Sequence, residues 1–267
     1  MRVIFMGTKP FAVKALEYLL EKDIEVVAVV TGDARVSALW KDALIETAHK
    51  YNIPITKDNE LYKALESKKQ DAKAPYKLDG IDLVISFGFT RRIKRPLIRL
   101  PKLGCVNFHP APLPDYRGMG GVYNFAIYRN LSEWGVSAHF VDEDFDTGDL
   151  IKVMKFNIDS SKETAFSLSQ KSHDYLVILF KEVIDMVSKD SPLPRTPQGK
   201  GEYISKQDLD SLRKIQPEDS AEEINKKIRA CWCPPHQGAC IELKGQEFTL
   251  VNEEILREIA KIHSEDK

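Results

Sequence analysis

Short, nearly continuous apolar segments alternate with segments of helical apolar spacing along most of this chain. The first apolar segments are Arg2–Met6 and 24–31, and between them lie a turn at 7–10 and a helical pattern over 11–21. Such a strand–helix–strand unit predicts parallel strands joined by a right-handed crossover. Because strands of this kind are apolar on both faces, the pattern predicts an α/β fold with an open, mostly parallel sheet and helices on both faces.

The same alternation predicts the remaining elements of the sheet. Strands are expected over 53–55, 81–87, 104–108, 136–142 and 150–156, and helices over 38–50, 59–67, 91–99 and 161–189. The polar segment 68–80 contains a proline and is expected to form an exposed loop. Ligands of such sheets bind outside the carboxyl ends of the strands. This rule places Gly7, 86–89 and 107–109 around one crevice.

Composition divides the chain into a core, a linker and a small C-terminal region. Residues 1–189 form the predicted core, and 190–201, rich in proline and glycine, form the predicted linker. Residues 202–267 form the predicted C-terminal α+β region. It contains helical patterns over 220–229 and 253–263, and a hairpin in which 239–242 and 247–251 pair around Lys244 and Gly245.

The charge balance argues against an extended nucleic-acid surface, because 39 Lys and Arg residues are matched by 40 Asp and Glu residues. A local basic patch stays compatible with this balance. The opening MRVIFMG lacks the apolar region and cleavage site of an export signal. No later segment approaches the roughly 20 apolar residues that cross a bilayer. We therefore expect a cytoplasmic protein without a membrane partner.

Three of the four cysteines, Cys231, Cys233 and Cys240, lie near the C-terminus with His236 among them, and Cys105 lies apart from them. In a reducing compartment they are expected to be thiols. A zinc site is one alternative, but a C-x-C spacing is not the usual C-x-x-C knuckle. We predict no metal and interpret the clustered cysteines as small apolar residues at alternating strand positions.

Two motifs carry the chemistry: VNFHPAPLPDYRG at 106–118 and GVSAHFVDEDFDTGDLI at 135–151. They resemble the formyltetrahydrofolate-dependent formyltransferases, which share an Asn-x-His element, a Leu-Pro-x-(Tyr/Phe)-(Arg/Lys)-Gly run and a later Asp-x-Gly-type loop. The opening FMGTKPFAVKALEYLL is similar to the start of methionyl-tRNA formyltransferases, so the resemblance spans nearly the whole chain. It implies a Rossmann-like formyltransferase core and 10-formyltetrahydrofolate as the co-substrate.

The resemblance implies a catalytic trio of Asn107, His109 and Asp146. Formyl transfer passes through a tetrahedral intermediate, and a pre-positioned amide donor such as Asn107 stabilises its oxyanion by roughly 3 to 4 kcal/mol. His109 either stabilises the oxyanion or moves the proton of the attacking amine, and the sequence leaves both roles open. Asp146 would orient His109 or a bridging water, so that a proton reaches the departing folate nitrogen.

Each of these residue types also has a structural explanation. Asn forms turns, single histidines are often structural, and Asp-rich loops are often solvated. The competitors of Asp146 on chemistry alone are Asp142, Asp144 and Asp149. The position before Thr147 and Gly148 favours Asp146. His139, on the strand before the loop, either orders water in the active site or is a buried structural histidine.

The resemblance assigns the folate pocket to two segments. The expected lining residues are Ser86, Phe87, Gly88, Phe89 and Ile93 on one wall, and Val141 and Asp142 on the other. Main-chain groups are expected to read the pterin edge, and Gly88 would let the flat ring approach the backbone. The alternative is a buried strand that turns into a helix. Family members often have Ser-Leu-Leu-Pro after the histidine, whereas this chain has Ala-Pro-Leu-Pro at 111–114, so no serine hydroxyl is available there for the acceptor.

Three acceptor classes fit the resemblance: a nucleotide-linked amino sugar, the α-amine of methionyl-tRNA, and glycinamide ribonucleotide. Purine enzymes of this kind generally end soon after the core helix, whereas this chain continues. The segment IRACWCPPHQGACIELKGQEFTLVN resembles both the C-terminal domain of methionyl-tRNA formyltransferases and the tail of amino-sugar formyltransferases. A tRNA enzyme should carry a fuller C-terminal barrel and a basic surface, whereas the pattern here predicts one hairpin and the helix over 253–263. We therefore predict a nucleotide-linked amino sugar as the acceptor, with methionyl-tRNA as the alternative.

Three residues are candidate acceptor contacts. Tyr203 and Trp232 are candidates to stack on a nucleobase, although Trp232 equally fits packing of the hairpin onto the core. Arg117 either binds a phosphate or faces solvent. Two functions of another kind stay open: a folate-binding protein without turnover, and a hydrolase that releases formate. The C-terminal hairpin fits a homodimer interface as well as a substrate wall.

Overall fold

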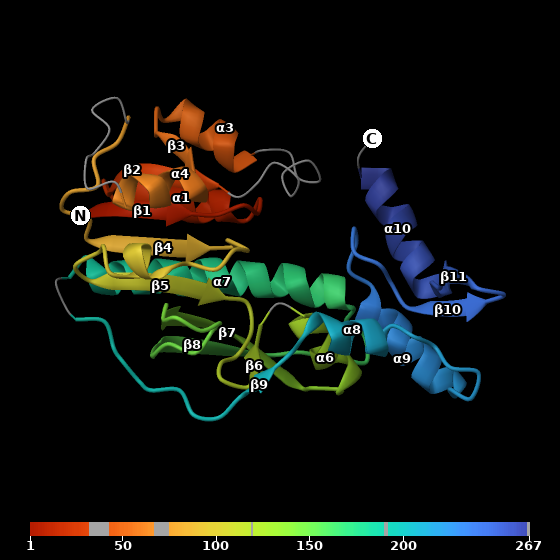
Figure 1. Ribbon diagram of the computed structural model, residues 1–267. Helices are drawn as coiled ribbons and strands as arrows, with labels where there is room; N and C mark the ends of the chain where they lie inside the picture. The colour runs from red at the N-terminus through yellow and green to blue at the C-terminus, as the bar shows by residue number, and fades with distance from the viewer. Residues whose placement is uncertain (32–42, 67–74, 119, 190–191, 266–267) are drawn as a thin grey trace.

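The computed structural model describes residues 1–31, 43–66, 75–118, 120–189 and 192–265, and their core is a seven-stranded sheet (Figure 1). The strand order is β3-β2-β1-β4-β5-β7-β8. The strands are β1 (Arg2–Met6), β2 (Glu25–Thr31), β3 (Ile55–Lys57), β4 (Leu83–Phe87), β5 (Gly104–His109), β7 (Glu133–Phe140) and β8 (Leu150–Asn157). Strands from β3 through β5 in this order pair in parallel, whereas β7 is antiparallel to both β5 and β8. The predicted α/β fold with a mostly parallel sheet is confirmed.

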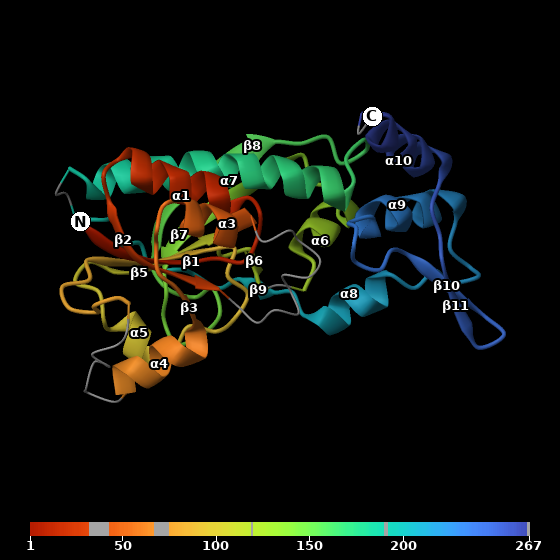
Figure 2. The same cartoon turned by 90° about the horizontal axis from the view of Figure 1, so that it is seen from above.

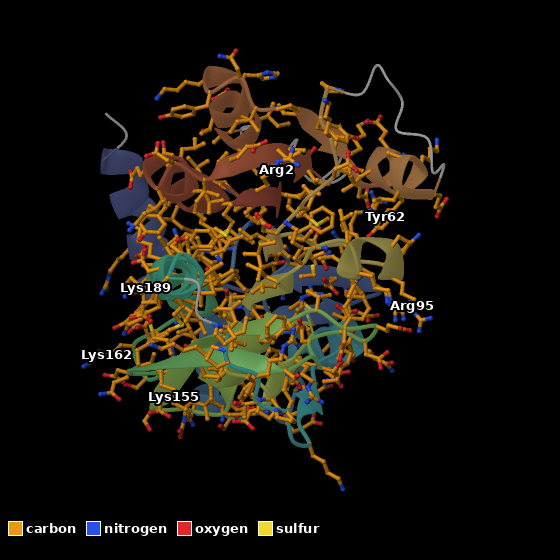
Figure 3. The ribbon with its side chains drawn as sticks, turned by 90° about the vertical axis from the view of Figure 1, so that its left-hand side faces the viewer. Arg2, Tyr62, Arg95, Lys155, Lys162 and Lys189 are labelled. Carbon is orange, nitrogen blue, oxygen red and sulfur yellow. The ribbon has the colours of Figure 1, made fainter. Side chains whose placement is uncertain are left out.

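Helices cover both faces of the sheet, as its apolar strands require (Figure 2). One face carries α1 (Ala12–Glu21), α3 (Ala43–Lys50) and α7 (Ala165–Val187), and the other carries α4 (Asp58–Glu66) and α5 (Arg95–Ile98). Seen end-on, Lys189 after α7 and Arg95 in α5 lie on opposite sides of the sheet (Figure 3). A capping box begins α7, because Thr164 and Ser167 each accept a hydrogen bond from the backbone N–H of the other.

Aromatic side chains fill the core between α7 and the sheet. The ring of Phe180, in α7, contacts Phe87 and Phe108 at centroid distances of 5.2 and 5.0 Å. Complete burial of one side chain of this size stabilises a fold by about 1.5 to 3 kcal/mol. This packing fixes β4 against β5, and the carboxyl ends of these two strands carry the predicted site residues.

Some predicted boundaries differ from the structure. The helix predicted over 91–99 is shorter, because the backbone at Lys94 is extended and Pro96 lies in the first turn of α5. The helix predicted over 161–189 begins later, at Ala165, directly after its N-cap residue Thr164. The predicted elements do not include β6 (Tyr116–Arg117) or α6 (Val122–Tyr128). The predictions for 38–42, 67–74 and 190–191 lie outside the described residues.

The C-terminal region lies beyond the carboxyl ends of the parallel strands (Figure 1). It consists of β9 (Glu202–Tyr203), α8 (Lys206–Leu212), α9 (Ala221–Cys231), β10 (Cys240–Leu243), β11 (Gln246–Thr249) and α10 (Glu253–Glu265). The predicted hairpin is confirmed: Lys244 and Gly245 at its turn both have positive φ, 53° and 77°. The two predicted helices of this region are confirmed, whereas α8 and β9 are additional. Among the described residues, no helix is long and apolar enough to cross a membrane.

Residues 192–201 run back along the β7–β8 side of the core toward β9 (Figure 1). Leu150 and Thr196 exchange backbone hydrogen bonds of 2.8 and 3.0 Å. A Cβ atom on Gly201 would lie 1.8 Å from the carbonyl oxygen of Pro114, so only glycine lets the chain pass the loop after β5 this closely. This segment therefore packs against the core. The division of the chain at 189 and 201 stays a prediction.

Candidate active site

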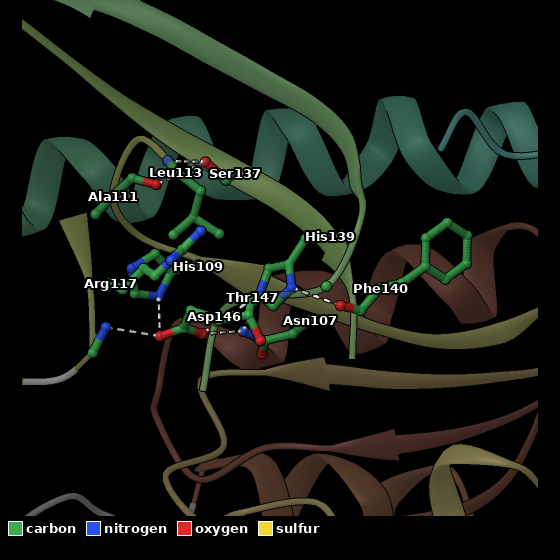
Figure 4. A network of polar contacts seen from close by, with 12 residues as sticks. Asn107, His109, Ala111, Leu113, Arg117, Ser137, His139, Phe140, Asp146 and Thr147 are labelled. Atoms are coloured by element: carbon green, nitrogen blue, oxygen red, sulfur yellow. Dashed lines mark hydrogen bonds and ion pairs between the residues drawn. The ribbon is translucent and has the colours of Figure 1, made fainter. Parts of the chain in front are cut away.

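Strand β5 carries two of the predicted catalytic residues to the carboxyl edge of the sheet. Asn107 and His109 alternate with core residues such as Phe108, so the strand presents both on its other face. The antiparallel neighbour β7 places His139 directly across from Asn107. His109 and His139 are only 4% and 2% exposed. The centre of the sheet therefore fixes three polar side chains beside one another (Figure 4).

Asp146 comes from the loop between β7 and β8 and completes this group. Its Oδ2 accepts a hydrogen bond of 2.9 Å from the Gly118 N–H. Its Oδ1 lies 3.5 Å from both Asn107 Nδ2 and His139 Nε2. Its Oδ2 also lies 3.6 Å from Nδ1 of His109. The structure thus brings together Asn107, His109 and Asp146, the three residues predicted as a catalytic trio (Figure 4).

The other carboxylates of this loop have different surroundings. Asp142 accepts hydrogen bonds from a threonine hydroxyl and a backbone N–H of its own loop. The Asp144 side chain is 83% exposed, and Asp149 forms an ion pair of 3.7 Å with Arg195. The Asp146 side chain is only 11% exposed. Asp146 is therefore the carboxylate of this loop that belongs to the buried polar group.

Both histidines have defined tautomers, because each contacts a backbone carbonyl and a carbonyl can only accept. His109 Nε2 lies 2.8 Å from the carbonyl oxygen of Tyr116 and therefore carries a proton. His139 Nδ1 lies 2.8 Å from the carbonyl oxygen of Phe140 and carries a proton in the same way. His139 Nε2 then accepts from the Asn107 amide at 3.0 Å. In neutral His109 the unprotonated Nδ1 faces a carboxylate oxygen.

Burial and neighbouring groups set the protonation states of the site. Burial lowers the pKa of His109; the Asp146 carboxylate opposes this shift and His139 adds to it. Burial raises the pKa of Asp146, but the Gly118 N–H and the two histidines, when they are protonated, favour the carboxylate more strongly. The pKa of Asp146 therefore lies well below its usual value. Near neutral pH the site holds a carboxylate beside a neutral imidazole that can accept a proton.

The residues predicted to line the folate pocket lie in two environments. Ile93 is buried, and Phe89 and Val141 pack against the same apolar cluster on the α4–α5 face. The ring of Phe87 packs against α7 on the opposite face, so this residue can offer a ligand only its backbone. Gly88 has a φ of 70° and follows Phe87 at the strand end. The remaining predicted residues are the buried Ser86 and the half-buried Asp142. Their contact with folate stays a prediction.

The predicted acceptor contacts also lie in two places. Arg117 and Tyr203 are neighbours in the parallel pair of β6 and β9. The Tyr203 ring packs over Gly118, whose N–H binds the Asp146 carboxylate, and Tyr203 is 55% exposed. Arg117 donates a hydrogen bond of 3.1 Å to Gln198. Trp232 packs against the buried cluster of the C-terminal region, which favours its structural interpretation.

The cysteines are free thiols in this structure. Cys231 ends α9, Cys233 lies outside any strand and Cys240 begins β10, so the prediction of alternating strand positions is wrong for Cys231 and Cys233. Burial raises the pKa of the Cys231 thiol to about 12, which makes it a weak nucleophile at neutral pH. Within the described ranges, no group of three or more His, Cys, Asp or Glu side chains is arranged to hold a metal ion.

Two contributors to the site are absent from the sequence-based predictions. Gly118, which donates to Asp146, is the last residue of the Leu-Pro-x-Tyr-Arg-Gly run. Its place in this motif is the sequence feature that could have identified it as part of the site. Gln198 donates to the carbonyl oxygens of Asp146 and Gly148. Its proline- and glycine-rich surroundings are typical of a linker, so the local sequence carries no sign of this contact.

The fold and the site together define a class of enzyme. A buried Asn–His–Asp group at the carboxyl edge of an open α/β sheet suits an acyl-type transfer that needs an oxyanion donor and a base. The family model described as formyl transferase matches residues 1–184. The chain belongs to this formyl transferase family. It is a formyltransferase, with formyltetrahydrofolate as its co-substrate.

Similar proteins of known function differ in their acceptors. The chain is 28% identical to the methionyl-tRNA formyltransferase of Clostridioides difficile (strain 630) over 234 residues, which cover 86% of this chain and 73% of that protein. It resembles the structure of WlaRD, a sugar 3N-formyl transferase in the presence of dTDP and 5-N-formyl-THF. The TM-score is 0.67 at 26% identity, with 86% of this chain and 78% of that chain covered.

A second solved structure is the N-formyltransferase from Helicobacter canadensis in complex with folinic acid and dTDP-3-aminofucose. The TM-score is 0.68 at 25% identity, with 94% of this chain and 88% of that chain covered. These similarities agree on formyl transfer, and they disagree on whether a tRNA or a sugar receives the formyl group.

Proposed function

We propose that this formyltransferase acts in the cytoplasm on the primary amine of a nucleotide-linked amino sugar. The observation that carries the proposal is the similarity to the enzyme complexed with dTDP-3-aminofucose, which covers 94% of this chain. The family model ends at residue 184, so this similarity extends into the C-terminal region as well. In that region lies Tyr203, which packs over Gly118, the residue whose N–H donates to Asp146.

The surroundings of the catalytic group support a nucleotide-linked acceptor. Tyr203 is 55% exposed and packs over Gly118, so its ring is available to stack on a nucleobase. Arg117, beside it in β6, has the planar guanidinium that binds phosphate oxygens in pairs. The formal net charge of −1 supplies no broad positive field for a tRNA.

The proposed chemistry makes His109 the general base. Nδ1 of neutral His109 and Oδ2 of Asp146 are two acceptors 3.6 Å apart, so one amine nitrogen of the substrate can donate to both. As the amine attacks the formyl carbon, Nδ1 takes up a proton, and the Asp146 carboxylate stabilises the resulting imidazolium. The imidazolium then gives its proton to the departing folate nitrogen. The products are the N-formyl sugar and tetrahydrofolate.

Asn107 is the proposed oxyanion donor. One of its N–H groups donates to His139 at 3.0 Å, and the other makes a weaker 3.5 Å contact with Asp146. The developing oxyanion can therefore replace this weaker contact at little cost. His139 holds the amide in this orientation, which gives this buried histidine a role beyond packing.

Methionyl-tRNA is the second candidate acceptor, because the similar protein from Clostridioides difficile is a methionyl-tRNA formyltransferase. The two candidates separate in one assay. Purified protein and 10-formyltetrahydrofolate are offered dTDP- or UDP-linked amino sugars in one series and charged methionyl-tRNA in another. Tetrahydrofolate release and the product mass are measured. We expect a formyl mass gain on an amino sugar.

A matched pair of variants tests the acceptor contact. Tyr203→Ala should raise KM for the nucleotide sugar about tenfold, since stacking on a base contributes roughly 1 to 3 kcal/mol. Tyr51→Ala is the control, because Tyr51 is also exposed, at 44%, and follows α3. Formylation of tRNA alone would make the second candidate correct. Formate release without any acceptor would make the protein a hydrolase instead.

A further inference from the structure

The Gln198 carboxamide joins three segments of the site. Its Nε2 donates to the carbonyl oxygens of Asp146, at 3.0 Å, and of Gly148, at 2.7 Å. Its Oε1 accepts from Arg117 Nη2 at 3.1 Å. These contacts use both N–H groups and the carbonyl of the amide, so its orientation is fixed. The reverse orientation would place the NH2 group against a guanidinium and the oxygen against two carbonyls.

The turn that Gln198 contacts is the part of the loop with unusual backbone geometry. Asp146 has a φ of 57°, in the left-handed region that disfavours residues other than glycine. Gly148 lies so close to the backbone of Phe140 that an added Cβ would be 2.0 Å from the Phe140 carbonyl oxygen. The two hydrogen bonds from Gln198 flank this turn. They therefore oppose a relaxation that would move the carboxylate away from His109.

Gln198 is itself held on both sides. Two residues earlier, Thr196 exchanges backbone hydrogen bonds with Leu150 at the start of β8. One residue later, the Gly199 carbonyl oxygen accepts from Arg117 Nη2 at 2.9 Å. The segment is therefore anchored to β8 and to β6, and the glutamine between the anchors has little freedom to move. A side chain held this firmly can position the loop that carries Asp146.

We propose that Gln198 is a positioning residue for formyl transfer, which holds the Asp146 turn in the conformation that presents its carboxylate to His109. In this role Gln198 acts through Asp146 and not by contact with a reactant. This inference rests on the catalytic role proposed for Asp146. It gives the proline- and glycine-rich segment at 192–201 a function in the active site in addition to its connecting role.

Two substitutions of similar size test the proposal. Gln198→Met removes both donors, and Gln198→Glu removes them while it keeps an acceptor for Arg117. Both should lower kcat about 10- to 100-fold, because a displacement of the order of 1 Å in a catalytic group can cost about two orders of magnitude. KM for formyltetrahydrofolate and the melting temperature should stay close to wild type. Gln237→Met, at an exposed glutamine, is the control. Wild-type kcat in both Gln198 variants would overturn the proposal.

A double-mutant cycle with Asp146→Asn shows whether the effect passes through the aspartate. If Gln198 acts only through Asp146, then Gln198→Met should lower kcat no further in the Asp146→Asn background. Independent, multiplying losses would overturn the proposal even if Gln198→Met alone is slow. An Asp146→Asn variant with wild-type kcat would instead refute the catalytic role of Asp146, and the positioning proposal would fall with it.

Discussion

The two sides of the active site are built in different ways. Asn107 and His109 project from β5, in the middle of the sheet, where the same packing that holds the fold together also positions them. Asp146 projects from a loop with left-handed backbone geometry and depends on hydrogen bonds from Gly118 and Gln198. A strand position is fixed mainly by the packing of the sheet, whereas a loop position depends on dedicated polar contacts. Changes around the loop should therefore alter catalysis more than stability, whereas changes around the strands should always lower stability as well.

The largest effect is expected at the loop itself. Asp146→Asn removes the charge that stabilises the His109 imidazolium, so kcat should fall about a thousandfold, within the range for general acid–base groups. The melting temperature should change little. Steady-state kinetics with formyltetrahydrofolate and circular dichroism measure both quantities. Asp144→Asn is the matched control, because that side chain is 83% exposed. A larger loss of activity in the control would show that the wrong carboxylate of this loop has been assigned.

On the strand side, Asn107→Ala should lower kcat about a hundredfold, which is the usual effect of losing one oxyanion donor. It should also destabilise the fold, because the buried His139 Nε2 loses its donor. Kinetics and urea unfolding of the same preparation test both expectations. The control is Asn157→Ala, at an exposed asparagine on β8. An Asn107 variant with normal kcat and lowered stability would leave this residue a purely structural role.

The same contrast explains what the sequence can predict. Asn107 and His109 lie at the end of an apolar run, so periodicity places them at a strand end and a motif identifies them. Asp146 is one of several carboxylates in its loop, and only its neighbours Thr147 and Gly148 distinguish it. Local patterns predict strand residues well, because the alternation of residue types within a strand already determines which face of the sheet each side chain occupies.

The supports of the loop escape such prediction. Gln198 lies in a segment whose composition is that of a linker. It contacts a residue that lies 52 positions earlier in the chain, so no local sequence pattern reveals the contact. The short strands β6 and β9 form for the same reason, since each is stable only beside the other. The helix α8 was detectable locally, because Ser205 and Asp208 form a capping box at its start.

A smaller effect is expected for a support of the strand side. The Ser137 hydroxyl donates to the Ala111 carbonyl and accepts from the Leu113 N–H, both in the loop after β5 (Figure 4). Ser137→Ala leaves these buried groups unpaired, which should cost about 1 to 3 kcal/mol of stability, while kcat changes less than about threefold. Urea unfolding and kinetics test this, with the exposed Ser188→Ala as the control. A loss of kcat with unchanged stability would contradict the difference between the two sides.

The smallest expected change is a shift in the pKa of His109. Burial holds this pKa below its usual value of about 6.5, and the Asp146 carboxylate partly opposes the shift. Asp146→Asn should therefore lower the pKa of His109 further. NMR titration of labelled histidine measures it in both proteins, and the spectrum of His109→Gln supplies the assignment. The histidines of the urea-unfolded protein provide the reference.

The sign of this shift separates the two roles of His109. A folded pKa below the unfolded value means that the unfolded chain binds more protons, so His109 should make the protein less stable as the pH falls below about 6.5. It also means that His109 is neutral near pH 7 and can accept the proton of the attacking amine. A measured pKa well above 7 would reverse both conclusions. The imidazolium would then stabilise the oxyanion, and proton removal would pass to the Asp146 carboxylate.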